Sequence, residues 1–245
     1  MDKAGHIHSA YFQGIITYKG MRWAGVSKSN SLLTGIITGT VFQSTLEVMD
    51  GFSSKWGFSW SDISANLIGT SAFALQQHYW DDQRISFKVS YIPVKYPQDL
   101  IFSTDENSFT RLDKRAASLY GTNHFERFLK DYNAQTYWAS FNIHSLLPEG
   151  NRWPAWLNVA IGYGAENMYG GFDNFWHENG VAYILDPVIY PRYRQFYIGL
   201  DLDLPKLNPG NNVLKTLCTA FNIFKIPMPA LEINTRGQLV FHLLR

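Results

Sequence analysis

The spacing of apolar residues predicts three helices at the start of the chain. Apolar side chains recur three or four positions apart over residues 2–23, 30–49 and 59–79, and no proline interrupts them. Ser59 and Asp62 have the spacing of a capping box at the start of the third helix, with Asp in place of the usual Glu or Gln. Short turns make consecutive helices antiparallel, so the three are expected to run up, down and up.

From residue 84 the period of the pattern changes to two, the period of a strand. Residues 84–91 alternate between polar and apolar side chains without an error. Residues 231–233 and 239–244 predict a closing hairpin that turns at Arg236-Gly237. The other expected elements are strands over residues 137–144, 156–165 and 195–204, short helices over residues 123–131 and 213–224, and a long connection over residues 93–123.

The strand over residues 195–204 has two contrasting faces, which leaves two architectures open. One face carries Phe196, Ile198 and Leu200, and the other carries Tyr197 and Asp201. In a small membrane barrel, whose strands need about 9 to 11 residues to cross, the apolar row meets lipid and the other row a polar interior. In a soluble sheet the apolar row packs against the helices, and the Asp row, which Asp203 continues, is a solvated face.

Composition shows an aromatic-rich chain with few charges. Aromatic residues make up 16% of the 245 residues and charged residues 17%, against about 25% charged residues in an ordinary soluble domain. The net charge of +1 provides no basic field, so nucleic acid is excluded as a partner. Aromatic residues gather at the ends of the predicted helices, as they do at membrane interfaces, namely Trp23, Trp56, Trp60, Tyr79 and Trp80.

Two stretches without a formal charge coincide with the second and third predicted helices. Residues 29–46 and 63–80 are apolar but diluted by Ser, Thr, Gly and Gln, which favours buried or interfacial helices over membrane spans. Ser31, Gly35 and Gly39 form a small-residue face on the second helix, which lets a neighbouring backbone approach closely.

Polar residues lie near the helix ends that an up-down-up arrangement brings together. Each helix contributes a pair spaced three or four residues apart, so both members share one helical face. We therefore expect an imidazole, several carboxylates and an amide to converge at one end of the module. The set comprises Asp2, His6, Glu47, Asp50, Asp62 and Asn66.

Two interpretations of this cluster remain open. Imidazole and carboxylate groups suit a divalent metal ion, or general acid and base catalysis. In the other interpretation the same residues form a structural polar network, in which Asp2 and Asp62 cap helices and Lys3 neutralises a carboxylate. The catalytic candidates are His6, Glu47, Asp50 and Asp62, with Asp2, Lys3 and Asn66 as supporting polar residues.

The motifs around these residues resemble a known family. Asp2-Lys3-Ala4-Gly5-His6, Glu47-x-x-Asp50 and Gly57-Phe58-Ser59-Trp60-Ser61-Asp62 with Asn66 and Gly69 are similar to the YfiM-like family of predicted bacterial envelope lipoproteins. The pattern more loosely resembles the VanZ-like membrane proteins. The resemblance implies a location at the outer membrane or in the periplasm, an export signal upstream, and membrane lipid or outer-membrane proteins as partners. It implies no known reaction.

Together these features predict an α+β protein. Residues 1–82 are expected to form a helical module, packed with an antiparallel sheet or small barrel in residues 83–245. The expected function is a structural or assembly role in the cell envelope, with no cofactor. The alternative is a membrane-proximal hydrolase or lipid-modifying enzyme, with a divalent metal ion as the cofactor the cluster would suit. An open pocket at the cluster favours the enzyme, whereas a closed, salt-bridged cluster favours the structural role.

Overall fold

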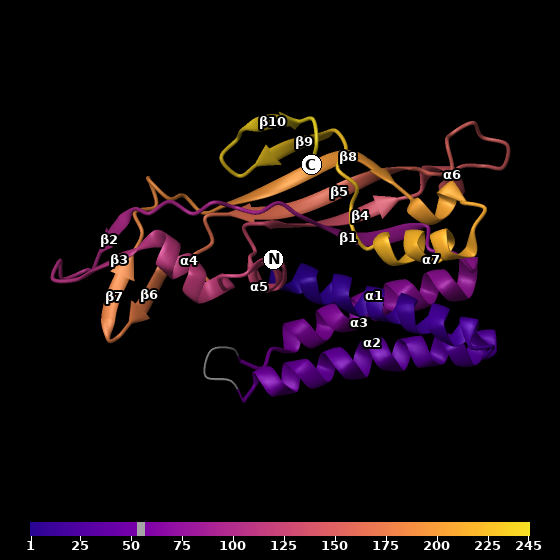
Figure 1. Cartoon of the computed structure of the whole chain (residues 1–245), viewed down its shortest axis with the longest axis horizontal. Helices are drawn as coiled ribbons and strands as arrows, with labels where there is room; N and C mark the ends of the chain where they lie inside the picture. Colours follow the sequence, from indigo (N-terminus) through magenta and orange to yellow (C-terminus); the bar gives the residue numbers. More distant parts are fainter. Residues whose placement is uncertain (53–56) are drawn as a thin grey trace.

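The computed structural model describes residues 1–52 and 57–245, so Trp56 lies outside the described residues. The three predicted helices are confirmed as α1 (Asp2–Trp23), α2 (Lys28–Asp50) and α3 (Trp60–Trp80). Consecutive helices run antiparallel, so α1 and α3 share one direction, and the three lie beneath a sheet with α1 nearest to the strands (Figure 1).

Small residues allow the three helices to pack closely. Ser31, Gly35 and Gly39 are buried on α2, as their spacing predicted. A Cβ on Gly35 would lie 2.8 Å from the carbonyl oxygen of Gly14, and one on Gly39 would lie 2.9 Å from that of Ala10. The face of α2 that packs against α1 and α3 therefore tolerates only small side chains.

A six-stranded antiparallel sheet forms most of the second half of the chain, so the α+β class is confirmed. The strands lie in the order β1-β4-β5-β8-β9-β10, and the longest pair, β5 with β8, runs in register over ten residues. The predicted strands and the closing hairpin are all present, with shifted ends. The bounds are β1 (Ile85–Tyr91), β4 (Gln135–Phe141), β5 (Leu157–Glu166), β8 (Tyr193–Leu202), β9 (Ala230–Asn234) and β10 (Leu239–His242).

A segment that follows the last helix pairs with one edge of this sheet. The amide of Val89 in β1 donates to the carbonyl of Ile223 at 2.9 Å, and the amide of Lys225 donates back to the carbonyl of Val89 at 3.0 Å. We call residues 222–228 the strap. At its far end the strap continues the ladder between β9 and β10, where the amide of Arg245 donates to the carbonyl of Met228 at 3.2 Å. The strap thus covers part of the β1 edge and leads directly into β9.

The two faces of the sheet have environments opposite to those of a soluble sheet. Phe196 and Ile198 are 47% and 54% exposed, whereas Tyr197 is 2% exposed and Asp201 is completely buried. The expectation that the Asp row is solvated is therefore wrong. The expectation that the apolar row of β8 packs against the helices is also wrong, because α1 packs against β1 and β4.

A separate lobe lies beyond one end of the sheet (Figure 1). Its aromatic core includes Tyr120, Tyr169 and Trp176. The long connection expected over residues 93–123 contains two short strands and a helix, and the short helix near residue 124 is confirmed. The lobe comprises β2 (Leu100–Phe102), β3 (Phe109–Arg111), α4 (Leu112–Tyr120), α5 (His124–Lys130), β6 (Phe175–Glu178) and β7 (Val181–Ile184).

Three short helices lie at the end of the sheet opposite to the lobe. The helix predicted near residues 213–224 is confirmed as α7, which has no buried residues and exposes Val213, Leu214 and Phe221. The three are α6 (Ile143–Leu146), the 3₁₀ helix η1 (Leu204–Leu207) and α7 (Asn212–Phe221).

Candidate functional site

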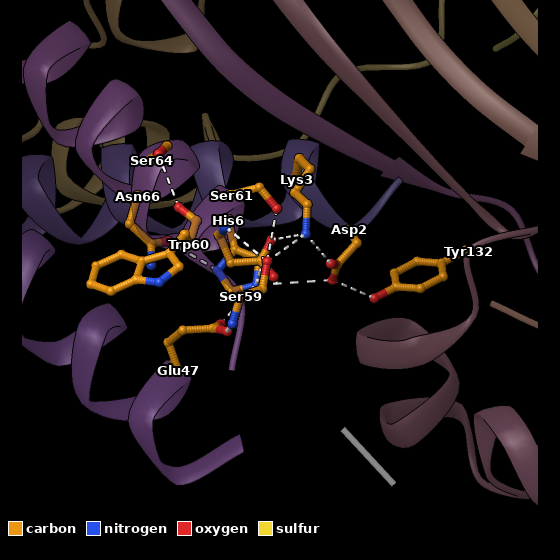
Figure 2. A network of polar contacts seen from close by, with 11 residues as sticks. Asp2, Lys3, His6, Glu47, Ser59, Trp60, Ser61, Ser64, Asn66 and Tyr132 are labelled. Atoms are coloured by element: carbon orange, nitrogen blue, oxygen red, sulfur yellow. Dashed lines mark hydrogen bonds and ion pairs between the residues drawn. The ribbon is translucent and has the colours of Figure 1, made fainter. Parts of the chain in front are cut away.

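The polar residues predicted to converge meet at one end of the helical module, beside α5, with the exception of Asp50. The first two turns of α1, the last turn of α2 and the first two turns of α3 supply them (Figure 2). Lys3 and Asp2 come from α1, Glu47 from α2 and Asp62 from α3. The up-down-up topology explains this, because it places these three helix ends side by side.

His6 lies at the centre of the cluster. Its Nε2 atom is 3.9 Å from Oδ1 of Asp2, 4.0 Å from Oε2 of Glu47 and 3.9 Å from Oδ1 of Asp62. Its Nδ1 atom lies 3.0 Å from Oδ1 of Asn66, which is fully buried. Because a carbonyl oxygen only accepts, Nδ1–H is the donor, and a neutral imidazole then has its Nε2 lone pair facing the three carboxylates.

Lys3 provides the positive charge that balances part of this cluster. Its ammonium forms ion pairs with Asp62 Oδ1 and, at 3.1 Å, with Asp2 Oδ2. Burial alone would lower the pKa of Lys3, but the ion pairs with Asp62 and Asp2 outweigh this effect and raise the pKa. Lys3 therefore stays protonated and is a poor general base.

Asp2 is held by a residue from outside the helical module. The hydroxyl of Tyr132, which follows α5, donates to Asp2 Oδ1 at 2.9 Å. Burial alone would raise the pKa of Asp2, but this hydrogen bond and the ammonium of Lys3 lower the pKa. Burial, with the adjacent carboxylate of Asp2, raises the pKa of Tyr132. Tyr132 carried no signal in the sequence, because it lies in a connection without a repeating pattern.

The start of α3 is shaped by side chains that satisfy its free amides. The hydroxyl of Ser59 accepts from the amide of Asp62 at 3.3 Å, which confirms the predicted cap. The amide of Ser59 donates to Oε1 of Glu47 at 2.5 Å. Glu47 therefore ties α2 to the start of α3 and still has its second oxygen directed at His6.

Two residues near the cluster remain outside it. Asp50 ends α2 on the same side, but within residues 1–52 and 57–245 no hydrogen bond or ion pair joins it to the other candidates. His8 lies on another face of α1, where it is buried and contacts the rings of Phe12 and Tyr137. His8 is thus a packing residue in this structure.

The cluster is salt-bridged but open on one side. A cavity of about 160 Å³ lies next to it, and its walls include Asp2, His6, Gln43 and Tyr132. The side chain of His6 is 18% exposed, and that of Asp2 is 47% exposed. The arrangement thus combines a partly accessible imidazole with buried carboxylates. Such a group can accept or donate a proton at Nε2, or coordinate a metal ion there.

Comparison with known proteins identifies a relative of the helical module alone. Residues 1–78 match the model of a family described as "Predicted periplasmic lipoprotein (DUF2279)". This match supports a location in the cell envelope and an uncharacterised lipoprotein-like family, and it gives no support to the YfiM-like or VanZ-like naming. No curated protein matches the chain. No solved structure matches it. The helical module is therefore similar to a predicted envelope lipoprotein family whose function is unknown.

Proposed function

We propose that this chain is a structural component of the bacterial outer membrane, in which the helical module and the apolar face of the sheet both contact lipid. The observation that carries the proposal is the reversed polarity of the sheet. Ile161, Phe196 and Ile198 point outward and are about half exposed, whereas Lys88 and Asp201 are completely buried on the other face. In water this arrangement would expose apolar side chains and bury charges, but lipid outside a polar interior favours it.

The helical module has the same reversed polarity. On α2 the residues packed against α1 and α3 include Ser31, Gln43 and Glu47, whereas Leu33 and Ile37 are among the exposed ones. Among the described helices, α2 alone is long and apolar enough to cross a membrane by length and composition. Its 23 residues correspond to about 34 Å of helix, and the hydrocarbon core of a bilayer measures about 30 Å.

The ends of these elements carry the residues expected at membrane interfaces. At the end near α7, Trp23 and Tyr79 are strongly exposed, and at the opposite end Phe52 and Trp60 are. Aromatic side chains with such exposure are typical of the boundary between lipid and water. The strap supports the same placement, because it pairs backbone groups of the edge strand β1 that lipid would leave without partners.

Depth-dependent quenching tests the proposal. Single cysteines at Ile37, Ile161 and Ile198, made in a Cys218→Ser background, carry a fluorescent label in protein reconstituted into vesicles with brominated lipids. We expect strong quenching at all three positions and none for the matched label at Lys114, which is exposed on α4 in the lobe. Absence of quenching at the three apolar positions in folded protein contradicts the proposal.

A second candidate function is a lipid-modifying enzyme or hydrolase at the membrane surface. The observation in its favour is the cavity beside His6, at the end of the helices where lipid head groups would lie. The test is to incubate the reconstituted protein with phospholipid vesicles and to analyse the lipids by mass spectrometry. Lipid products that form with the wild type but not with His6→Gln support the enzyme. Unchanged lipids contradict the enzyme and favour the structural role.

A further inference from the structure

We propose that Asp2, His6 and Asp62, with Glu47 as a fourth ligand, bind a divalent transition-metal ion, and that the ammonium of Lys3 competes with this ion for the site. The inference concerns ligand binding, so it does not depend on contact between the protein and lipid. It rests on the geometry of the donor atoms, on how they are held, and on the charge of the cluster.

The donor atoms have the spacing of a metal site. One ligand atom each from Asp2, His6 and Asp62 lie within 4.8 Å of one another. Glu47 adds an oxygen 4.0 Å from His6 Nε2. Tetrahedral zinc with bonds of about 2.1 Å separates its ligand atoms by about 3.4 Å. Closing a separation of 4.8 Å to this spacing takes about 0.7 Å of movement from each of the two side chains, so modest side-chain shifts bring these donors to bonding distance.

Hydrogen bonds from residues outside the ligand set orient the ligands, as they do in metal sites. The Nδ1–H group of His6 donates to the buried amide oxygen of Asn66, which leaves Nε2 free to coordinate. Tyr132 holds Asp2, and the amide of Ser59 holds Glu47. Such outer hydrogen bonds fix the orientation of ligating imidazoles and carboxylates.

Asp62 supplies a buried carboxylate oxygen whose partner is a single cation. The residue is 5% exposed, and among the described residues the partner of its Oδ1 atom is the ammonium of Lys3, with which it forms an ion pair. A buried carboxylate oxygen normally has several donors, so an atom in this position is suited to coordinate a cation.

The charge of the cluster matches a divalent ion. With their carboxylates ionised, Asp2, Glu47 and Asp62 carry three negative charges, and the ammonium of Lys3 balances one of them. Because an imidazole binds a metal ion in its neutral form, two negative charges then remain to balance a divalent ion. The side chain of Lys3 is 47% exposed on a flexible stem, so its ammonium can swing into solvent when an ion enters from the adjacent cavity.

The donor types indicate which class of ion binds. Calcium and magnesium prefer sites made of oxygen alone, whereas an imidazole nitrogen favours zinc and the neighbouring transition metals. One nitrogen with up to three carboxylate oxygens is thus a site for Zn²⁺, Mn²⁺ or Fe²⁺ rather than for Ca²⁺ or Mg²⁺.

Calorimetric titration of the full chain in detergent with Zn²⁺ tests the proposal, with Mg²⁺ as the comparison ion. We expect one Zn²⁺ per chain, and at least tenfold weaker binding for His6→Gln and for Asp62→Asn. Lys3→Met should bind Zn²⁺ at least fivefold more tightly, because it removes the competing ammonium. The matched controls His124→Gln and Lys114→Met, both at exposed positions in the lobe, should behave like the wild type.

Lys3→Met separates this proposal from a structural ion-pair network. In such a network the ammonium is an essential partner, so removing it lowers the melting temperature and Zn²⁺ does not restore stability. In a metal site, Zn²⁺ raises the melting temperature of Lys3→Met more than that of the wild type. The proposal is wrong if the folded wild type does not bind Zn²⁺, or if His6→Gln binds Zn²⁺ as tightly as the wild type does.

Discussion

Lys88 and Asp201 form an ion pair on the inner face of the sheet, where both side chains are completely buried. Nζ of Lys88 lies 2.8 Å from Oδ2 of Asp201. Each partner also holds the strap, because Lys88 donates to Oδ1 of Asn222 at 2.9 Å and the amide of Ile226 donates to Oδ1 of Asp201 at 3.1 Å. This pair therefore links the polar face of the sheet to the strap that covers the β1 edge.

Replacing one partner of this pair should be more harmful than replacing both. Lys88→Met leaves the carboxylate of Asp201 buried without its cation, which should lower the free energy of unfolding by about 3–5 kcal/mol. Combining it with Asp201→Asn removes the stranded charge and should recover part of this loss. Denaturant unfolding of the three proteins in detergent measures the difference. Equal stability of Lys88→Met and the wild type contradicts the assigned role.

The same pair explains why the sequence alone did not determine which face of the sheet is buried. Alternation in residues 195–204 identified two rows but gave no indication of which row is buried. That depends on whether Asp201 finds a partner, and the partner comes from β1, far away along the chain. Strands of seven to ten residues were predictable because the period repeats several times, whereas β2 and β6, with three and four residues, are too short to show one. The equally short β10 was predicted with its hairpin, which turns at Arg236-Gly237.

Close packing between α1 and α3 should make Gly69 intolerant of any side chain. A Cβ there would overlap the carbonyl oxygen of Ile7, which belongs to the backbone of α1 and has little freedom to move. We expect Gly69→Ala to cost about 1–3 kcal/mol. The control is Gly20→Ala, an exposed helical glycine with no atom within 4 Å of the added Cβ, which should stabilise by about 0.5–1 kcal/mol. Thermal unfolding followed by circular dichroism distinguishes them, and a neutral Gly69→Ala argues against this helix contact.

The site was more predictable than the sheet because it depends on topology alone. Once three helices alternate in direction, residues near Asp2, Glu47 and Asp62 must share one end of the module. What the pattern could not indicate is the contribution of Tyr132, which reaches the cluster from the chain after α5, or the separation of Asp50 from it. Both depend on side-chain directions at helix ends, which a hydrophobic period does not record.

The pH dependence of stability should show the burial of Asp203, which lies just beyond β8. Burial raises the pKa of this carboxyl above its ordinary value, although Lys88 and Lys206 oppose the shift. The folded state therefore keeps its proton at pH values where the unfolded state has lost it, so Asp203 lowers stability as the pH rises above about 4. We expect the unfolding free energy of the wild type to fall relative to that of Asp203→Asn as the pH rises above about 4, the ordinary pKa of Asp. Parallel stability curves for the two proteins contradict this prediction.

An arginine on the apolar face of β8 should distinguish lipid from water outside the sheet. Ile198 is 54% exposed, so in water Ile198→Arg should change the free energy of unfolding by no more than about 0.5 kcal/mol. Near the midplane of a bilayer the same substitution should cost about 2–4 kcal/mol, because the guanidinium loses its hydration. The measurement is reversible unfolding of protein reconstituted in lipid, with Ser118→Arg on the exposed side of α4 as the matched control. A large loss at residue 198 with none at residue 118 supports a lipid-facing sheet. Equal and small effects at both positions place this face in water.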